Sequence, residues 1–184
     1  GIAHLAEMTS LTSLDLSYSK IDDAGLRFVK SLAKLRELNL EVTGISDAGL
    51  VHIRDLSQLE MLNLSLGGVT DDGLVHLGRL HQLEVLDLSR SSVSGTGLVH
   101  LKELPQLHSL SLYDSKLTDT GLTNLKGPAS LEDLEGSTAA NEVQTFSSIS
   151  TTPHTPSSER LHRARRIADP RRLPTRRAGR RHGV

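Results

Sequence analysis

Four histidines recur at intervals of 24 residues or a multiple of it, and together they could bind a metal ion. His52, His76 and His100 are 24 residues apart, and His4 lies two such intervals before His52. Imidazole groups stacked in a column could bind a transition metal. However, no carboxylate recurs beside them, and a surface helix often carries histidine with no metal attached. We therefore expect no metal site and no cofactor.

Other catalytic patterns are equally poorly represented. The Gly95–Gly97 segment contains G-x-G but lacks the third glycine of a dinucleotide-binding loop. The sequence has no H-E-x-x-H, P-loop or calcium-loop pattern, and no Ser/His/Asp set in a context that marks a nucleophile. With no cysteine, disulfides and thiolate metal sites are excluded. We predict that the chain is not an enzyme.

The histidine spacing belongs to a repeat that runs through most of the chain. Leucine recurs every 24 residues, and we number each of these leucines position 1 of a coil. Positions 4 and 6 are also leucine, position 11 is aliphatic, and position 15 is glycine followed by leucine. Coils one to five begin at Leu11, Leu35, Leu59, Leu83 and Leu107.

Each coil divides into a strand half and a helical half. In L-x-x-L-x-L, positions 4 and 6 share one face of an extended segment, so position 5 points to the opposite side, toward solvent. Positions 16, 19 and 22, such as Leu50, Ile53 and Leu56, have helical spacing. The Ser, Thr and Asp residues at positions 12 and 13 are suitable N-caps for that helix. Stacked coils can bury the apolar stripe that no single coil can bury.

These motifs resemble the leucine-rich-repeat family. The segments KIDDAGL, GISDAGL, GVTDDGL and KLTDTGL resemble its [ST]-D-x-G-L subclass, found in bacterial repeat proteins and F-box substrate adaptors, while SVSGTGL departs from it at Gly95. The resemblance implies an α/β fold: a curved leucine-rich-repeat solenoid with short parallel strands on the concave face and helices on the convex face.

The repeat sets the expected domain boundaries. We predict a solenoid over residues 1–136, with a partial repeat at 1–10, five full repeats at 11–130 and a broken sixth at 131–136. Residues 137–184 are Ser/Thr-rich and then Arg-rich, which predicts a disordered tail. Loss of the period after Gly136 also fits a frame-shifted translation. Neither end of the solenoid shows a polar capping unit, so we expect a fragment of a longer repeat protein.

Charge separates the two segments. Residues 1–136 hold 11 Lys and Arg against 19 Asp and Glu, a net charge of −8, whereas residues 137–184 carry a net charge of +7. An Arg-rich tail could bind nucleic acid, but we rank that partner below a protein. No apolar run approaches the length of a membrane span, and no signal segment is visible. The sequence does not identify a cellular compartment.

The concave face is the binding surface that the resemblance implies. Met61, Val85 and Leu66 form its apolar centre, with acidic residues around them. We expect a non-catalytic, monomeric scaffold that binds a protein partner there; the adaptor role is the alternative. The predicted contact residues are Glu37, Asn39, Met61, Asn63, Leu66, Val85, Asp87, Arg90 and Tyr113.

Overall fold

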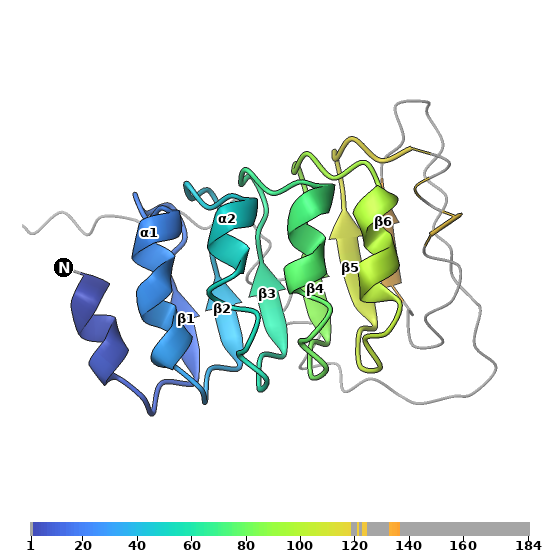
Figure 1. Cartoon of the computed structure of the whole chain (residues 1–184). Helices are drawn as coiled ribbons and strands as arrows, with labels where there is room; N and C mark the ends of the chain where they lie inside the picture. The colour runs from blue at the N-terminus through green and yellow to red at the C-terminus, as the bar shows by residue number, and fades with distance from the viewer. Residues whose placement is uncertain (1, 119–120, 122, 125–132, 137–184) are drawn as a thin grey trace, which may run out of the picture. The chain divides into compact units, whose positions relative to one another are not determined.

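A computed structural model describes residues 2–118, 121, 123–124 and 133–136, which form a stack of coils (Figure 1). Each coil contributes one short strand, turns back through a helical segment, and returns to the next strand one repeat later. Neighbouring coils therefore lie side by side in the order of the sequence.

The strands form one parallel sheet, and its register repeats the sequence period. Each strand pairs with the next one in the chain, and every pair is offset by one repeat, so that Leu38 lies between Leu14 and Leu62. Position 4 therefore faces position 4 throughout. The strands are β1 (Ser13–Asp15), β2 (Glu37–Asn39), β3 (Met61–Asn63), β4 (Val85–Asp87), β5 (Ser109–Leu112) and β6 (Asp133–Gly136).

The helical halves are shorter and tighter than a regular α-helix. In coils one and two the helical half begins with α1 (Asp23–Leu26) and α2 (Asp47–Leu50), and η2 (Arg27–Ser31) continues α1 as a 3-10 helix. The other helical segments are the 3-10 helices η1 (Ile2–Glu7), η3 (Asp71–His76) and η4 (Thr96–Leu101). Three residues is the period of a 3-10 helix, so Leu98 and Leu101, at positions 16 and 19 of η4, lie on one side of it, and both are buried.

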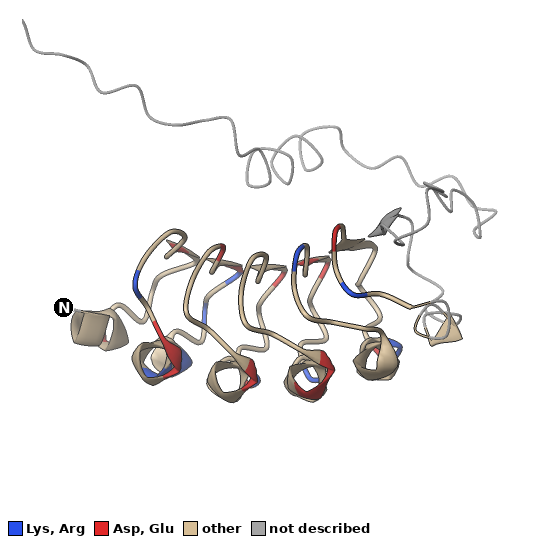
Figure 2. Ribbon diagram, turned by 90° about the horizontal axis from the view of Figure 1, so that it is seen from above, with Lys and Arg blue, Asp and Glu red and all other residues tan. Residues whose placement is uncertain are grey.

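The stack is curved. Seen from above, the strands line the inner side of the arc and the helical segments line the outer side (Figure 2). This arrangement confirms the predicted fold, a solenoid with strands on the concave face and helices on the convex face.

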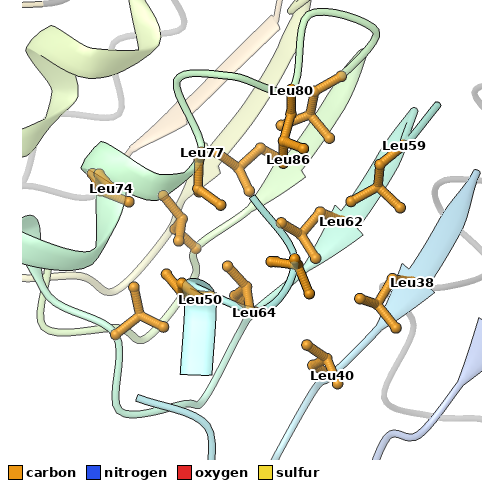
Figure 3. Close-up of a cluster of buried hydrophobic side chains, with 14 of the residues drawn as sticks. Leu38, Leu40, Leu50, Leu59, Leu62, Leu64, Leu74, Leu77, Leu80 and Leu86 are labelled. Atoms are coloured by element: carbon orange, nitrogen blue, oxygen red, sulfur yellow. The ribbon is translucent and has the colours of Figure 1, made fainter. Parts of the chain in front are cut away.

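The core lies between the sheet and the helical segments. Leucines at positions 4 and 6 of successive strands, such as Leu38, Leu62 and Leu64, point toward leucines of the helical side, such as Leu50 and Leu74 (Figure 3). All five are at least 98% buried. In the first coil, by contrast, Leu14 and Leu16 are only half-buried. The predicted apolar stripe thus becomes a closed core from the second coil onward.

The sixth strand completes the described part of the sheet. β6 pairs in parallel with β5, with Leu134 aligned to Leu110 and Gly136 aligned to Leu112. The rest of this predicted broken repeat is not described, and the tail predicted for residues 137–184 lies outside the described residues, as does its nucleic-acid alternative. Within the part of the chain that the structure describes, no helix has the length and apolarity needed to cross a membrane.

Candidate functional site

The middle of the concave face combines apolar and acidic side chains at position 3. Glu37, Met61 and Val85 lie side by side on β2, β3 and β4, and all three are half-buried. Ser13 of β1 donates its hydroxyl hydrogen to Glu37 Oε2 at 2.9 Å. Adjacent strands are about 4.8 Å apart, so these side chains form one continuous row.

The side chains at position 5 accept hydrogen bonds from the backbone of the turn that follows each strand. The side-chain oxygen of Asn39 accepts from the backbone N–H of Glu41 at 3.0 Å, and Asp87 accepts from Ser89 N at 2.8 Å. The same bond is made by Asn63, which is buried with 6% of its surface exposed. The position-5 residues named as contacts therefore shape the turn, and Asn63 offers a partner little surface.

A row of left-handed residues follows the turns. Position 8 has a positive φ in all five coils, between 52° and 56°, although none of these residues is glycine. We call this set the left-handed row; its side chains are exposed, including 36% for Val42 and 42% for Leu66. Its members are Tyr18, Val42, Leu66, Arg90 and Asp114.

Polar contacts hold both ends of the left-handed row. Tyr18 donates its hydroxyl hydrogen to Glu41 Oε1 at 2.9 Å, and this bond to a carboxylate raises the pKa of the phenol. At the other end, Arg90 Nε lies 3.2 Å from Asp114 Oδ2, and the guanidinium lies 5.9 Å from the centre of the Tyr113 ring. The two tyrosines and Arg90 are exposed, so they remain accessible to a partner.

The convex side carries a second set of acids, which serve coil stacking. Asp23 accepts from Ser46 N at 2.8 Å and from the Ser46 hydroxyl at 2.6 Å, and Asp47 accepts from Thr70 in the same way. Asp71 accepts from the N–H and hydroxyl of Ser94. We call these contacts, each joining position 13 to position 12 of the next coil, the Asp ladder. Figure 2 shows acidic residues on the helical segments of the convex side.

The Asp ladder changes the role expected for position 13. Position 12 is the N-cap in coils one to three, as predicted, since Asp22, Ser46 and Thr70 each accept from a backbone N–H of their own helix. Position 13 instead accepts hydrogen bonds from position 12 of the following coil. Sequence reasoning missed this contact because the residues at positions 12 and 13 both have N-cap chemistry. The glycine that recurs at position 15 could have indicated it, because a side chain there would collide with the aspartate of the preceding coil. A Cβ at Gly49 would lie 2.4 Å from Asp23 Oδ1.

Asp71 is the most heavily bonded member of the ladder. Besides Ser94, it accepts from Gly95 N at 2.9 Å and from Gly97 N at 2.7 Å. Burial alone would raise the pKa of Asp71, but these four hydrogen bonds outweigh it and lower the pKa below its ordinary value. The ladder ends at Gly95, which replaces the carboxylate and has a φ of +111°.

Other candidate features carry less chemistry. His4 and His100 are exposed and His52 and His76 are half-buried, and the described residues contain no group of three or more metal-ligating side chains. An open hollow of about 490 Å³ beside η1 is lined largely by apolar side chains. Its lining also includes His4 and Ser19, but the Ser19 hydroxyl donates to the Leu16 carbonyl at 2.5 Å.

Comparison with known proteins supports the architecture. A family model described as Leucine Rich repeat matches residues 7–29. An internalin (inlF) from Listeria monocytogenes is 27% identical with a TM-score of 0.63, and the match covers 75% of this chain and 38% of the internalin. Internalin C2 from the same organism is 25% identical with a TM-score of 0.63, covering 74% of this chain and 56% of that one.

More distant similarity extends only to the fold. A plant peptide hormone receptor, RGFR1, solved in complex with RGF2, is 20% identical with a TM-score of 0.53, over 72% of this chain and 22% of the receptor. No curated protein matches the sequence. The chain spans about two fifths and just over half of the two internalins. Together with the register of the sheet, these findings identify the described coils as a leucine-rich-repeat solenoid.

Proposed function

We propose that this chain is a non-catalytic scaffold that binds a protein partner on its concave face. The observation that carries the proposal is the row of Glu37, Met61 and Val85, in which half-buried apolar side chains lie beside a carboxylate on a rigid sheet. Protein interfaces commonly have an apolar centre and a polar rim. The solenoid neighbours support an interaction scaffold of this kind.

The charge of the concave face favours a basic partner. At positions 3, 5, 7 and 8 of the five coils, the acids are Asp15, Glu37, Glu41, Asp87 and Asp114, whereas Arg90 is the sole Lys or Arg. Complementary charge increases the rate of encounter and excludes acidic competitors. A segment rich in Lys or Arg is therefore the expected ligand.

The adaptor alternative receives no independent support from the motif that suggested it. The Ser, Thr and Asp of [ST]-D-x-G-L are engaged in the Asp ladder, for example between Asp47 and Thr70. The motif is thus explained by coil stacking. A role in a ubiquitin-ligase adaptor stays a prediction.

Selection from a displayed library of random 20-residue peptides tests the proposal. Peptides selected on the wild-type protein should lose at least tenfold in affinity for a Met61→Lys/Val85→Lys variant. A Val75→Lys/Val99→Lys variant is the matched control, because it adds the same charge at valines exposed on the helical side. Equal affinity for wild type and Met61→Lys/Val85→Lys, with both variants folded by circular dichroism, would contradict binding on the concave face.

A further inference from the structure

The residues of the left-handed row have a backbone conformation that favours glycine, yet all of them carry side chains. A β-branched or bulky residue at positive φ is a conformational outlier, and glycine or asparagine adopts this region more easily. Position 8 nevertheless carries Tyr18, Val42 and Leu66 in successive coils. Such outliers persist when the surrounding structure imposes them, and they cluster at functional sites.

The backbone explains the conformation but not the choice of residue. The N–H of Tyr18 donates to Glu41 O at 2.8 Å, that of Val42 to Ser65 O at 3.1 Å, and that of Leu66 to Ser89 O at 3.0 Å. These bonds link each turn to the next coil. Glycine or asparagine at position 8 has the same N–H and would make the same bond with less strain. The fold therefore requires the backbone conformation and leaves the side chain free to serve another purpose.

The side chains of the row are placed for contact. Tyr18 is 64% exposed and Leu66 42% exposed, and Val42 lies in the coil between theirs. A continuous parallel sheet joins the coils, and the N–H of Val42 donates to Ser65 O, so the apolar pair Val42 and Leu66 lies on adjacent, linked turns. A partner meets a preorganised apolar ridge and loses little entropy in ordering it.

We propose that the left-handed row is the principal contact ridge for the partner, a protein segment carrying aliphatic side chains flanked by Lys or Arg. Val42 and Leu66 supply the apolar centre. Glu37, Glu41 and Asp87, in the neighbouring strands and turns, supply carboxylates for the cations. This inference rests on the proposed function and assigns the largest share of the binding to the ridge, ahead of position 5.

Substitution by asparagine separates binding from folding. Asparagine tolerates positive φ, so a Val42→Asn/Leu66→Asn variant should keep or raise the thermal midpoint of the protein. It should bind the selected peptides at least tenfold more weakly than wild type. A Val75→Asn/Val99→Asn variant removes comparable exposed apolar surface on the helical side and should bind like wild type. The selected peptides should be enriched in Lys, Arg and aliphatic residues.

The outcomes distinguish the ridge from the face as a whole. If Val42→Asn/Leu66→Asn binds within twofold of wild type while Met61→Lys/Val85→Lys does not bind, the ridge is refuted and the concave-face function stands. If neither variant loses affinity, both are refuted. Peptides enriched in Asp and Glu would also overturn the assignment. Sedimentation of the wild type as a dimer that Val42→Asn/Leu66→Asn dissociates would replace the peptide partner with a second copy of the chain.

Discussion

Replacing Asp71 by asparagine should destabilise the solenoid far more than the same change at Asp47. Asp71 uses both carboxylate oxygens: Oδ1 accepts from Gly95 N and Gly97 N, and Oδ2 accepts from the N–H and hydroxyl of Ser94. An amide has one oxygen, so whichever way it is turned its NH₂ group opposes at least one backbone N–H. Asp47 accepts from Thr70 N through Oδ1 and from the Thr70 hydroxyl through Oδ2. There the amide keeps the first bond and can donate to the hydroxyl oxygen.

The expected difference follows from these bonds. A hydrogen bond to a charged group contributes about 1.5–3 kcal/mol, and a donor left unsatisfied costs about 1–3 kcal/mol. Asp71 is half-buried, so water compensates part of the loss. We expect Asp71→Asn to lower the free energy of unfolding by about 2–3 kcal/mol, and Asp47→Asn by less than about 1 kcal/mol, in line with these bond energies.

Urea denaturation followed by circular dichroism measures the global difference. Amide hydrogen exchange adds a local measurement. The favoured amide orientation keeps its oxygen on Gly95 N and Gly97 N, so the N–H of Ser94 should lose protection in Asp71→Asn, whereas the N–H of Thr70 should keep it in Asp47→Asn. Equal losses of stability in the two variants would refute the reasoning, because opposing a backbone N–H at Asp71 would then cost nothing.

The lowered pKa of Asp71 adds a dependence on pH. A carboxyl group whose pKa is lower in the folded state contributes stability above its unfolded pKa of about 4, and this stability is lost as pH falls through the folded pKa. The gap in stability between wild type and Asp71→Asn should therefore be full at neutral pH and should shrink below about pH 4. A gap that stays constant down to pH 2 would exclude the carboxylate as its source.

Substitutions at four glycines test the other contacts. Gly95→Asp restores the residue common at position 13, yet it should lower the thermal midpoint, because φ is +111° and a Cβ would lie 2.4 Å from Gly121 Cα; a raised midpoint would show that the sequence pattern outweighs this contact. Gly49→Ala should destabilise by about 2 kcal/mol through the clash with Asp23, whereas Gly25→Ala, whose Cβ would meet only side-chain atoms at 3.0 Å or more, should be neutral or stabilising in urea titration. Gly67→Ser should stabilise by about 0.5–1 kcal/mol, since Ser19 and Thr43 at the same position donate to a carbonyl three residues earlier; a Gly67→Ala variant separates the hydroxyl from the loss of chain entropy.

The sequence predicted the fold because its signal is periodic. Leucines at positions 1, 4 and 6 recur with one spacing, and a period can be read without knowing any contact. The strand register and the stacked core follow from it, whereas the concave and convex sides were predicted from the resemblance to the leucine-rich-repeat family. The helical conformation was harder to predict, because i, i+3 spacing fits both an α-helix and a 3-10 helix.

The candidate site was less accessible to sequence reasoning. Alternation along a strand places Asn63 on the solvent side, yet it is buried, whereas Asn39 and Asp87 make the same turn bond and are only half-buried. The positive φ of Val42 leaves no trace in the residue type, since valine is a poor indicator of that conformation. Asp23 and Asp47 have N-cap chemistry wherever they bond, so their partners in the next coil emerged only from the coordinates. Where the chemistry of a side chain allows two hydrogen-bond partners, only the three-dimensional contacts show which partner it has.

The Asp ladder has a consequence for how such a chain can change in length. Each of coils one to three carries an acceptor for its successor, and each of coils two to four carries the Ser or Thr that its predecessor needs. Coils two and three carry both the Asp and the Ser or Thr, so tandem duplication or deletion of either recreates a matched junction, and unequal recombination can vary their number without new compensating substitutions. A duplicate of the fourth coil inserted directly after it would bring two Gly95 equivalents into succession and repeat the interruption. Growth by gene duplication is therefore favoured on the N-terminal side of that coil.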